Sequence, residues 1–159
     1  MKIAIYPGSF DPITLGHLDI IRRAAACFDK VYVCVTYNCE KKNPMFQPEK
    51  RLEMVRESVQ ELPNVEAESY CGLLADYARK KQAQVLVKGI RNATDFDMEY
   101  QMAAINKGLW PQLETVFFPA SAPYQHFSST MVREMIRYGQ DMTRYVPAPV
   151  VEELNKRDD

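Results

Sequence analysis

The chain has 159 residues, of which 47% are hydrophobic and 26% are charged. A chain of this length buries roughly 70% of the surface that it exposes when unfolded, so one domain can form without a disulfide or a metal to hold its core. The 20 Lys and Arg residues against 21 Asp and Glu residues give a formal net charge of −1. That balance excludes a generally basic surface, so any recognition of phosphate must depend on a local site.

Short β-branched runs alternate with segments of helical periodicity along the whole chain. Strands are expected at 2–6, 31–36, 65–70, 84–88 and 114–118, and helices at 15–28, 48–61, 73–82, 94–109, 129–138 and 148–156. Parallel strands need crossover connections, which are usually helical. We therefore expect an α/β fold, a Rossmann-like doubly wound sheet of five parallel strands in a single domain over 1–159. In such folds ligands bind beyond the carboxyl ends of the strands.

The loop after the first expected strand carries the strongest functional signal. Gly8 permits backbone angles that are closed to other residues, and Thr14 is suited to cap the following helix. Gly16 and His17 then fall in the first helical turn, where free N–H groups and the helix dipole favour a bound phosphate. A lone histidine there would more often be a satisfied structural residue. The loop is neither a Walker A sequence nor a G-x-G-x-x-G motif.

The run Gly8-Ser9-Phe10-Asp11-Pro12, followed by Thr14-Leu15-Gly16-His17, resembles the signature of nucleotidyltransferases with an (H/T)-x-G-H motif. Within that superfamily, the chain from Ile3 to about Leu154 is similar to the bacterial phosphopantetheine adenylyltransferases. The resemblance implies transfer of AMP from ATP to 4′-phosphopantetheine by direct in-line attack, which gives dephospho-coenzyme A and pyrophosphate. It also implies Mg²⁺ that arrives with ATP, with no metal ligands from the protein, a homohexamer, and coenzyme A as a feedback ligand.

A basic loop follows the second expected strand, in the run Glu40-Lys41-Lys42. A lysine pair in a polar loop is usually only solvated. The resemblance implies that one of these lysines binds substrate and stabilises the transition state together with His17. Counting from His17 selects Lys41, whereas counting back from Pro44 selects Lys42, so both stay candidates.

The fourth expected strand runs into Lys88-Gly89-Ile90-Arg91. Two cations that flank a glycine at a strand's carboxyl end can face one anion, although the segment could also be a simple cationic turn. The resemblance assigns Lys88 to the phosphopantetheine phosphate and Arg91 to the ATP phosphates, where Arg91 also acts in catalysis. The family usually has Arg at the position of Lys88, so the charge is kept here and the bidentate fork is lost.

Acids and hydroxyls mark two further segments. Asp95, Asp97 and Glu99 open a helix, where acids are favoured electrostatically, and the resemblance selects Glu99 for the ATP pocket. Three successive hydroxyls at 128–130 exceed the one that a helix cap needs. The residues implied for ATP are Ser9, Phe10, His17, Gly89, Ile90, Arg91, Glu99, Tyr124, Ser128, Ser129 and Thr130. Those implied for phosphopantetheine are Ser9, Lys41, Leu73, Leu74 and Lys88.

The cysteines Cys27, Cys34, Cys39 and Cys71 show no C-x-x-C spacing, and two histidines make a zinc site hard to assemble. We expect four reduced thiols, with Cys27 and Cys34 as small core residues. The longest apolar stretches fall far short of the roughly 18 residues that a membrane span requires. We therefore expect a cytoplasmic protein with no membrane or nucleic-acid partner.

Two other functions stay open. A cytidylyltransferase for an alcohol phosphate, or a mononucleotide adenylyltransferase, would share the opening motif and differ in its acceptor. A non-catalytic nucleotide-binding module could use the same fold, because fold alone does not establish activity. The hexamer has weak support from the sequence, since six residues could supply an interface or belong to the core: Tyr100, Met102, Trp110, Met131, Met135 and Tyr138.

Overall fold

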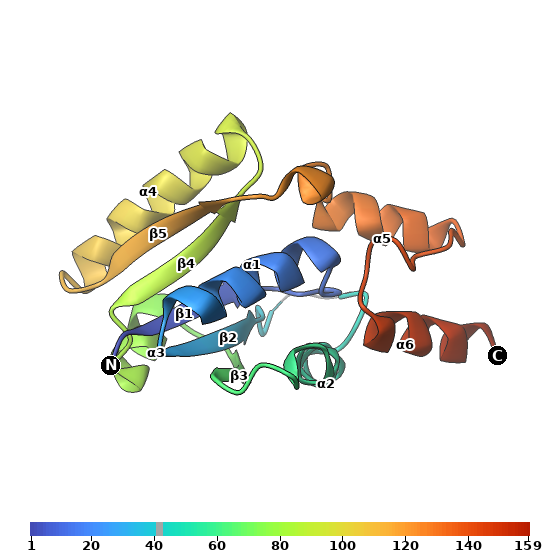
Figure 1. The fold of residues 1–159 in the computed structure, drawn as a ribbon, viewed down its shortest axis with the longest axis horizontal. Coiled ribbons are helices and arrows are strands. Elements are labelled where there is room, and N and C mark those ends of the chain that lie inside the picture. The colour runs from blue at the N-terminus through green and yellow to red at the C-terminus, as the bar shows by residue number, and fades with distance from the viewer. Residues whose placement is uncertain (41–42) are drawn as a thin grey trace.

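A computed structural model describes residues 1–40 and 43–159 of the chain. Its centre is a sheet of five parallel strands in the order β3-β2-β1-β4-β5 (Figure 1). The strands are β1 (Ile3–Gly8), β2 (Lys30–Thr36), β3 (Val65–Tyr70), β4 (Val85–Ile90) and β5 (Glu114–Pro119). The expected five-stranded Rossmann-like α/β fold is confirmed.

Helices connect the strands and close the chain. They are α1 (Leu15–Cys27), α2 (Pro48–Val59), α3 (Leu74–Lys81), α4 (Ala93–Leu109), α5 (Ser129–Arg137) and α6 (Ala148–Asp158), with a short 3₁₀ turn η1 (Ala122–Tyr124) that the sequence did not predict. All other elements end within two residues of their expected bounds. None of the helices in the described part of the chain is long and apolar enough to cross a membrane.

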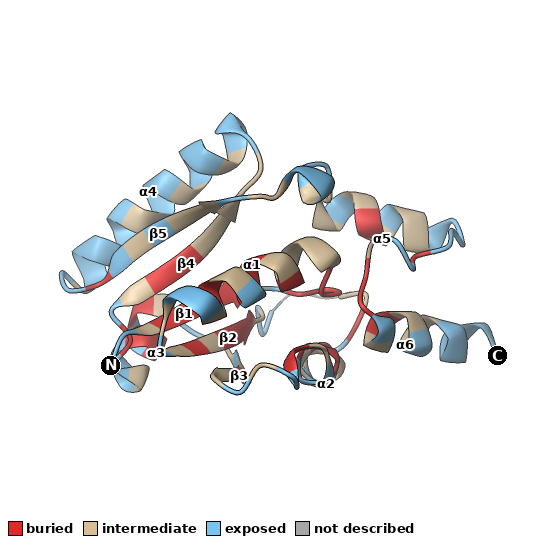
Figure 2. Cartoon of the chain, in the orientation of Figure 1, coloured by how far each residue is buried: buried red, intermediate tan, exposed pale blue. Residues whose placement is uncertain are grey.

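The strands alternate their side chains between two core clusters, as the pleat requires. On one face Ala4 and Val33 pack against the buried sides of α1 and α2, and α5 and α6 complete this cluster. On the other face Ile5 and Leu86 pack against α3 through Tyr77. The most buried segments include β1, β2, residues 10–14 of the β1–α1 loop and the inner side of α1, as the red parts of the ribbon show in Figure 2.

The chain changes direction across the sheet between β1 and β4. It winds outward from β1 through β2 to β3, and then returns to the other side of β1 as β4 and β5. A crevice is expected at the carboxyl ends of the two strands that flank such a switch point. Gly89 in β4 allows a close approach there, since a Cβ at this position would lie 3.2 Å from Cγ1 of Ile20 in α1.

The cysteines differ from expectation in two respects. Cys39 and Cys71 form a disulfide, so the expectation of four reduced thiols is wrong for this pair. Sequence spacing could not reveal it, because the two residues become neighbours only through the pairing of β2 with β3. Cys34 is a core residue as expected, but Cys27 is exposed at the end of α1, where the larger Phe28 makes the core contact instead.

Candidate active site

The amino end of α1 places His17 in a doubly bonded cap. Thr14 is the N-cap, and its hydroxyl accepts a hydrogen bond from the backbone N–H of His17. In return, Nδ1 of His17 accepts a hydrogen bond of 3.0 Å from the backbone N–H of Thr14. The imidazole thus has the place that a glutamate holds in a usual capping box. The expected position of Thr14 as cap and of His17 in the first turn is confirmed.

This cap determines which nitrogen of His17 carries the proton. Because Nδ1 accepts from the backbone, a neutral ring must hold its proton on Nε2. Burial, and then the positive charge of Arg91, lower the pKa of His17 from its ordinary 6.5 to about 4. The edge of the Phe10 ring packs against the imidazole, with 5.0 Å between ring centroids. Near neutral pH His17 is therefore a fixed, uncharged N–H donor.

The two cations at the end of β4 are each paired with an acid from α4. Nε of Arg91 lies 2.9 Å from Oδ2 of Asp95, and its Nη2 lies 3.1 Å from Oδ1, so this pair is bidentate. The guanidinium of Arg91 holds the pKa of Asp95 below its usual range. Nζ of Lys88 lies 3.1 Å from Oε2 of Glu99, without the alignment of a hydrogen bond. The positive charge expected at this edge is thus largely compensated within the chain.

The hydroxyls at the start of α5 have separate tasks. Ser128 is the N-cap of α5, since its side chain accepts from the N–H of Met131 at 3.0 Å. Oγ1 of Thr130 accepts a weak bond of 3.4 Å from Arg133. Ser129 is left to line the crevice. Ser128 therefore does the capping, and of the other two hydroxyls Ser129 is the one that faces the crevice.

A cavity of about 250 Å³ lies in the crevice at the switch point. It gathers seven of the residues that the sequence selected: His17, Lys88, Gly89, Arg91, Glu99, Tyr124 and Ser129. Its wall also contains residues that the sequence did not select, including Tyr6, Asp19 and Ser121. Oγ of Ser121 donates to Oδ2 of Asp19 at 2.7 Å, which ties the β5–α5 connection to α1. Asp19 could have been selected from the sequence by its position, because it follows His17 by two residues in the same helical turn.

A second cavity, of about 880 Å³, lies next to the first, beyond the β1–α1 loop. Gly8 lines the first cavity, and its neighbour Ser9 lines the second, so the loop forms the wall between them. Arg51, Arg133 and Arg137 also line the second cavity. These three arginines were missed because each reads as an ordinary polar residue of an amphipathic helix.

The structure does not bring every selected residue to a cavity. Phe10 is only 1% exposed and packs against the His17 ring. Leu74 packs on the α3 core cluster, whereas Leu73 is 56% exposed. Ile90, Ser128 and Thr130 line neither cavity. Lys41 and Lys42 lie outside the described residues.

Comparison with known proteins identifies the family of the chain. Residues 5–135 match the family model for cytidylyltransferase-like proteins, which places the chain in that class of nucleotidyltransferase. The phosphopantetheine adenylyltransferase of Heliobacterium modesticaldum is 45% identical over 157 residues, which cover 99% of this chain and 93% of the relative. That of Picosynechococcus sp. is 51% identical over 152 residues, which cover 96% and 85%. The chain belongs to the phosphopantetheine adenylyltransferase family.

One solved structure shows how widely the fold is shared. A bifunctional NMN adenylyltransferase/ADP ribose pyrophosphatase from Francisella tularensis superposes with a TM-score of 0.75 over 98% of this chain and 49% of that chain. Its sequence is only 19% identical. The likeness therefore extends to the fold alone.

Proposed function

We propose that the chain transfers AMP from ATP to 4′-phosphopantetheine, giving dephospho-coenzyme A and pyrophosphate. The observation that carries the proposal is identity of 44–51%, over 96–99% of this chain, to enzymes named for this reaction. The crevice adds the expected chemistry, because His17, Lys88 and Arg91 surround one cavity at the switch point. The same relatives favour phosphopantetheine over an alcohol phosphate or a mononucleotide as the acceptor.

Catalysis would depend on positioning two anions and on stabilising the charge that builds on the transferring phosphoryl group. The acceptor phosphate would attack the α-phosphorus of ATP in line, without a covalent intermediate on the protein. His17 would donate from Nε2–H, because its other nitrogen is bonded to the backbone of Thr14. Lys88 and Arg91 would turn from Glu99 and Asp95 toward the substrate phosphates, which are the stronger anions.

The two cavities offer a place for each substrate. ATP would take the first cavity, where the helix dipole of α1 and the open hydroxyl of Ser129 favour phosphate. The acceptor would extend through the second cavity past Ser9. Because Gly8 and Ser9 are adjacent in the loop that separates the cavities, the two phosphates would meet beside His17. One lysine of Lys41 and Lys42 would join them there.

Three further features belong to the proposal. Mg²⁺ would be held mainly by ATP phosphates and water and would neutralise phosphate charge, since the nearby acids Asp95 and Glu99 are already engaged by cations. Coenzyme A would act as a feedback ligand, because it retains the phosphopantetheine part of the acceptor. The cytoplasm would be its location, with no nucleic-acid or membrane partner.

We also propose that the protein is a homohexamer, with α4 in a contact between copies. The six candidate interface residues divide in the structure, because Trp110, Met131 and Met135 pack against the core whereas Tyr100, Met102 and Tyr138 are exposed. The outer side of α4 is pale blue in Figure 2, yet it presents large apolar side chains. Met98 is 65% exposed and Tyr100 is 60% exposed. Such a patch on one helix is typical of a surface that another protein covers.

Pyrophosphate release from ATP and Mg²⁺ tests the reaction, with 4′-phosphopantetheine, an alcohol phosphate and nicotinamide mononucleotide offered separately. Release with phosphopantetheine alone is expected, and no release with it would refute the proposed function.

Replacing His17→Ala should lower turnover by about 10²–10³, the usual loss for one such donor, while ATP still binds. His126→Ala, which removes the other histidine, is the matched control. Turnover of His17→Ala within about threefold of the parent would remove His17 from the mechanism.

A further inference from the structure

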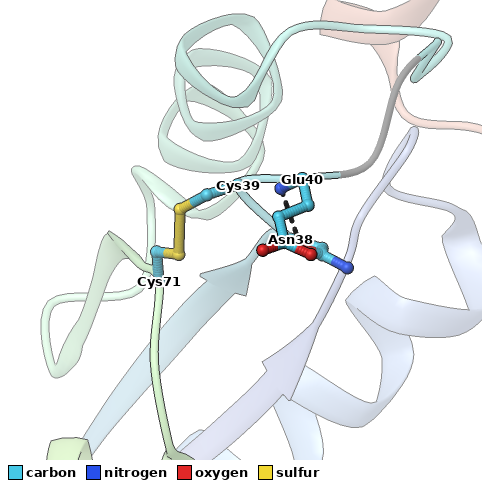
Figure 3. Close-up of a disulfide and its surroundings, with 4 residues drawn as sticks. All are labelled: Asn38, Cys39, Glu40 and Cys71. Atoms are coloured by element: carbon cyan, nitrogen blue, oxygen red, sulfur yellow. Dashed lines mark hydrogen bonds between the residues drawn. A yellow bond between two sulfur atoms is a disulfide. The ribbon is translucent and has the colours of Figure 1, made fainter.

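The disulfide between Cys39 and Cys71 lies at the carboxyl edge of the sheet (Figure 3). Cys39 comes three residues after the end of β2, and Cys71 follows β3 directly. The last residues of these strands, Thr36 and Tyr70, are partners in the sheet. The link therefore joins the β2–α2 connection to the β3–α3 connection across 32 residues of sequence.

Both cysteines of the link are exposed, so a dissolved thiol can reach either sulfur atom. Cys34 is different, because it is buried and burial raises the pKa of its thiol to about 12. A domain of this size does not need a cross-link to hold its core. Exposed disulfides are commonly the labile or regulatory ones. The link is therefore better placed for reversible chemistry than for holding the fold.

The link also fixes part of the wall of the second cavity, to which Cys39 contributes. Among the described residues from Asn38 to Pro44, no hydrogen bond reaches a distant part of the chain, and the N–H of Glu40 bonds only to Asn38 (Figure 3). The next attachment comes at Met45, whose N–H donates to Asp11 at 3.0 Å. The disulfide is thus the cross-link that ties this described part of the wall to β3.

The other end of the link lies directly after β3, whose last residue, Tyr70, is paired with Thr36 of β2. Gly72 has a φ of +147°, which lets the chain turn from β3 into α3 within three residues. A Cβ at Gly72 would lie 3.1 Å from the Tyr70 ring, so a residue with a side chain would fit poorly at this position. Cys71 adjoins this paired residue, whereas Cys39 lies three residues beyond the end of β2. Opening the disulfide would therefore change the wall at Cys39 more than the chain at Cys71.

We propose that Cys39 and Cys71 are a redox-active site for low-molecular-weight thiols, and that opening their disulfide weakens binding of the acceptor without changing binding of ATP. The disulfide holds the wall of the second cavity in place before the acceptor binds. Less conformational entropy is then lost when the acceptor binds. ATP is unaffected because the link touches only the second cavity. The effect on the acceptor rests on the proposed function, whereas the exchange of thiols does not.

Opening the disulfide requires only two molecules of a small thiol. A thiolate attacks one sulfur of the link, the bond between Cys39 and Cys71 breaks, and a mixed disulfide forms while the other cysteine leaves as a thiolate and takes a proton. A second thiol then attacks the mixed disulfide. Two small thiols are oxidised to one disulfide, and the protein gains two thiols. An oxidised small disulfide reverses both steps. 4′-Phosphopantetheine itself ends in a thiol and belongs to the same class of reductant.

Counting thiols tests the exchange directly. The protein is equilibrated in buffers of reduced and oxidised glutathione, alkylated in denaturant and weighed by mass spectrometry. Two alkylated cysteines, Cys27 and Cys34, are expected under oxidising conditions, and four under reducing conditions. A parallel series with phosphopantetheine as the only thiol shows whether the acceptor itself can open the link. Four reactive thiols in every glutathione buffer would overturn the proposal.

Kinetics tests the consequence, with an S-methylated acceptor that cannot exchange. The KM for this acceptor should be about three- to tenfold higher for the reduced protein than for the oxidised protein, whereas the KM for ATP should stay within about twofold. Cys39→Ser and Cys71→Ser should resemble the reduced protein in every buffer. Cys27→Ser, which removes an exposed thiol elsewhere, should keep the full response.

Failure of the redox coupling and failure of the proposed function give different results. An equal acceptor KM in the two redox states would overturn the coupling, even if the link opens. No turnover of unmodified phosphopantetheine in either state would instead refute the proposed function, and the thiol count would still judge the redox site. Thermal melting identifies a serine variant that fails to fold, in which case the other variant gives the same comparison.

Discussion

His17 is held by the backbone of its own helix cap, and this contact decides its chemistry. We expect the ring to stay neutral down to a pH of about 4, because burial and Arg91 disfavour the imidazolium. In a His126→Gln variant His17 is the only imidazole, so ¹⁵N NMR can follow it without ambiguity. The spectra should show an unprotonated Nδ1 and a protonated Nε2 throughout the neutral range.

The lowered pKa of His17 should also make the free energy of unfolding depend on pH. Between pH 6.5 and about 4 the unfolded chain binds a proton at His17 that the folded chain does not. The free energy of unfolding should therefore fall as the pH is lowered through this window, and fall less for a His17→Gln variant. Urea unfolding at pH 7 and pH 5 measures the difference. An NMR midpoint near 6.5, or a proton on Nδ1, would contradict the assignment.

At the scale of single residues, the sequence predicted which residues belong to the site better than it predicted their pairing. Thr14 and His17 could be placed in a helical cap because the residue types and their spacing are local properties. The pairing of Lys88 with Glu99 and of Arg91 with Asp95 was not predicted, although all four residues were singled out. The pair of Lys88 and Glu99 joins β4 to α4 and so depends on tertiary packing. Arg91 and Asp95 are only four residues apart, and their pair depends on the local turn into α4, where Asp95 also accepts from the backbone N–H of Arg91. Together the two pairs compensate the positive charges expected at the end of β4.

Between elements, two arginines hold the β1–α1 loop by its carbonyl groups. Nη1 of Arg51, from α2, donates to the carbonyl of Ser9 at 3.0 Å, and Nη1 of Arg133, from α5, donates to the carbonyl of Asp11 at 3.4 Å. Arg51 is only 5% exposed, and no carboxylate of the described residues forms an ion pair with it. Its Nε also has no partner there. A buried cation with so little compensation is costly, which points to a positioning task.

We expect Arg51→Met to lower kcat/KM for the acceptor about tenfold or more, since small displacements of positioning groups cost up to about 10² in rate. Stability should change less, because the lost hydrogen bond of about 1.5–3 kcal/mol is offset by removal of a buried charge. Arg51→Lys, which keeps the charge without the fork, should recover part of the rate. Arg56→Met, on the same helix with a bond to Ala67, is the matched control. Equal kinetics for the two methionine variants would contradict the role of Arg51.

The helices and strands could largely be predicted from the sequence, and two strands differ from their expected bounds. β1 and β4 each run two residues further than expected, through Pro7 and Gly8 and through Gly89 and Ile90. Gly and Pro are poor strand formers by propensity, but pairing with neighbouring strands carries the chain through them. The disulfide was missed for a related reason, since Cys39 and Cys71 meet only after β2 and β3 pair. Local signals predicted the elements, and long-range pairing determined what meets at their ends.

For the whole molecule, near-neutrality conceals an uneven distribution of charge. In the first cavity the cations Lys88 and Arg91 are balanced by Glu99 and Asp95. The second cavity instead has three arginines in its wall, Arg51, Arg133 and Arg137, against Asp11 and Glu49. The carboxylate of Asp11 accepts the N–H groups of two residues of the β2–α2 connection and keeps its negative charge. The three arginines still outnumber the two acids, so the excess of positive charge lies on the side proposed for the acceptor.

The exposed apolar side of α4 allows the proposed assembly to be tested. Met98, Met102, Ile105 and Leu109 follow one another at helical spacing and are all exposed. A charge among them should be poorly tolerated in a contact between copies, so Met98→Lys should shift the mass in sedimentation equilibrium from a hexamer toward smaller species. The monomer fold should persist, because this side chain contributes little to the core. Gln60→Lys, which adds the same charge at the exposed end of α2, should leave the mass unchanged. A parent protein that sediments as a monomer at micromolar concentration would refute the hexamer, and an unaltered hexamer for Met98→Lys would move the contact away from α4.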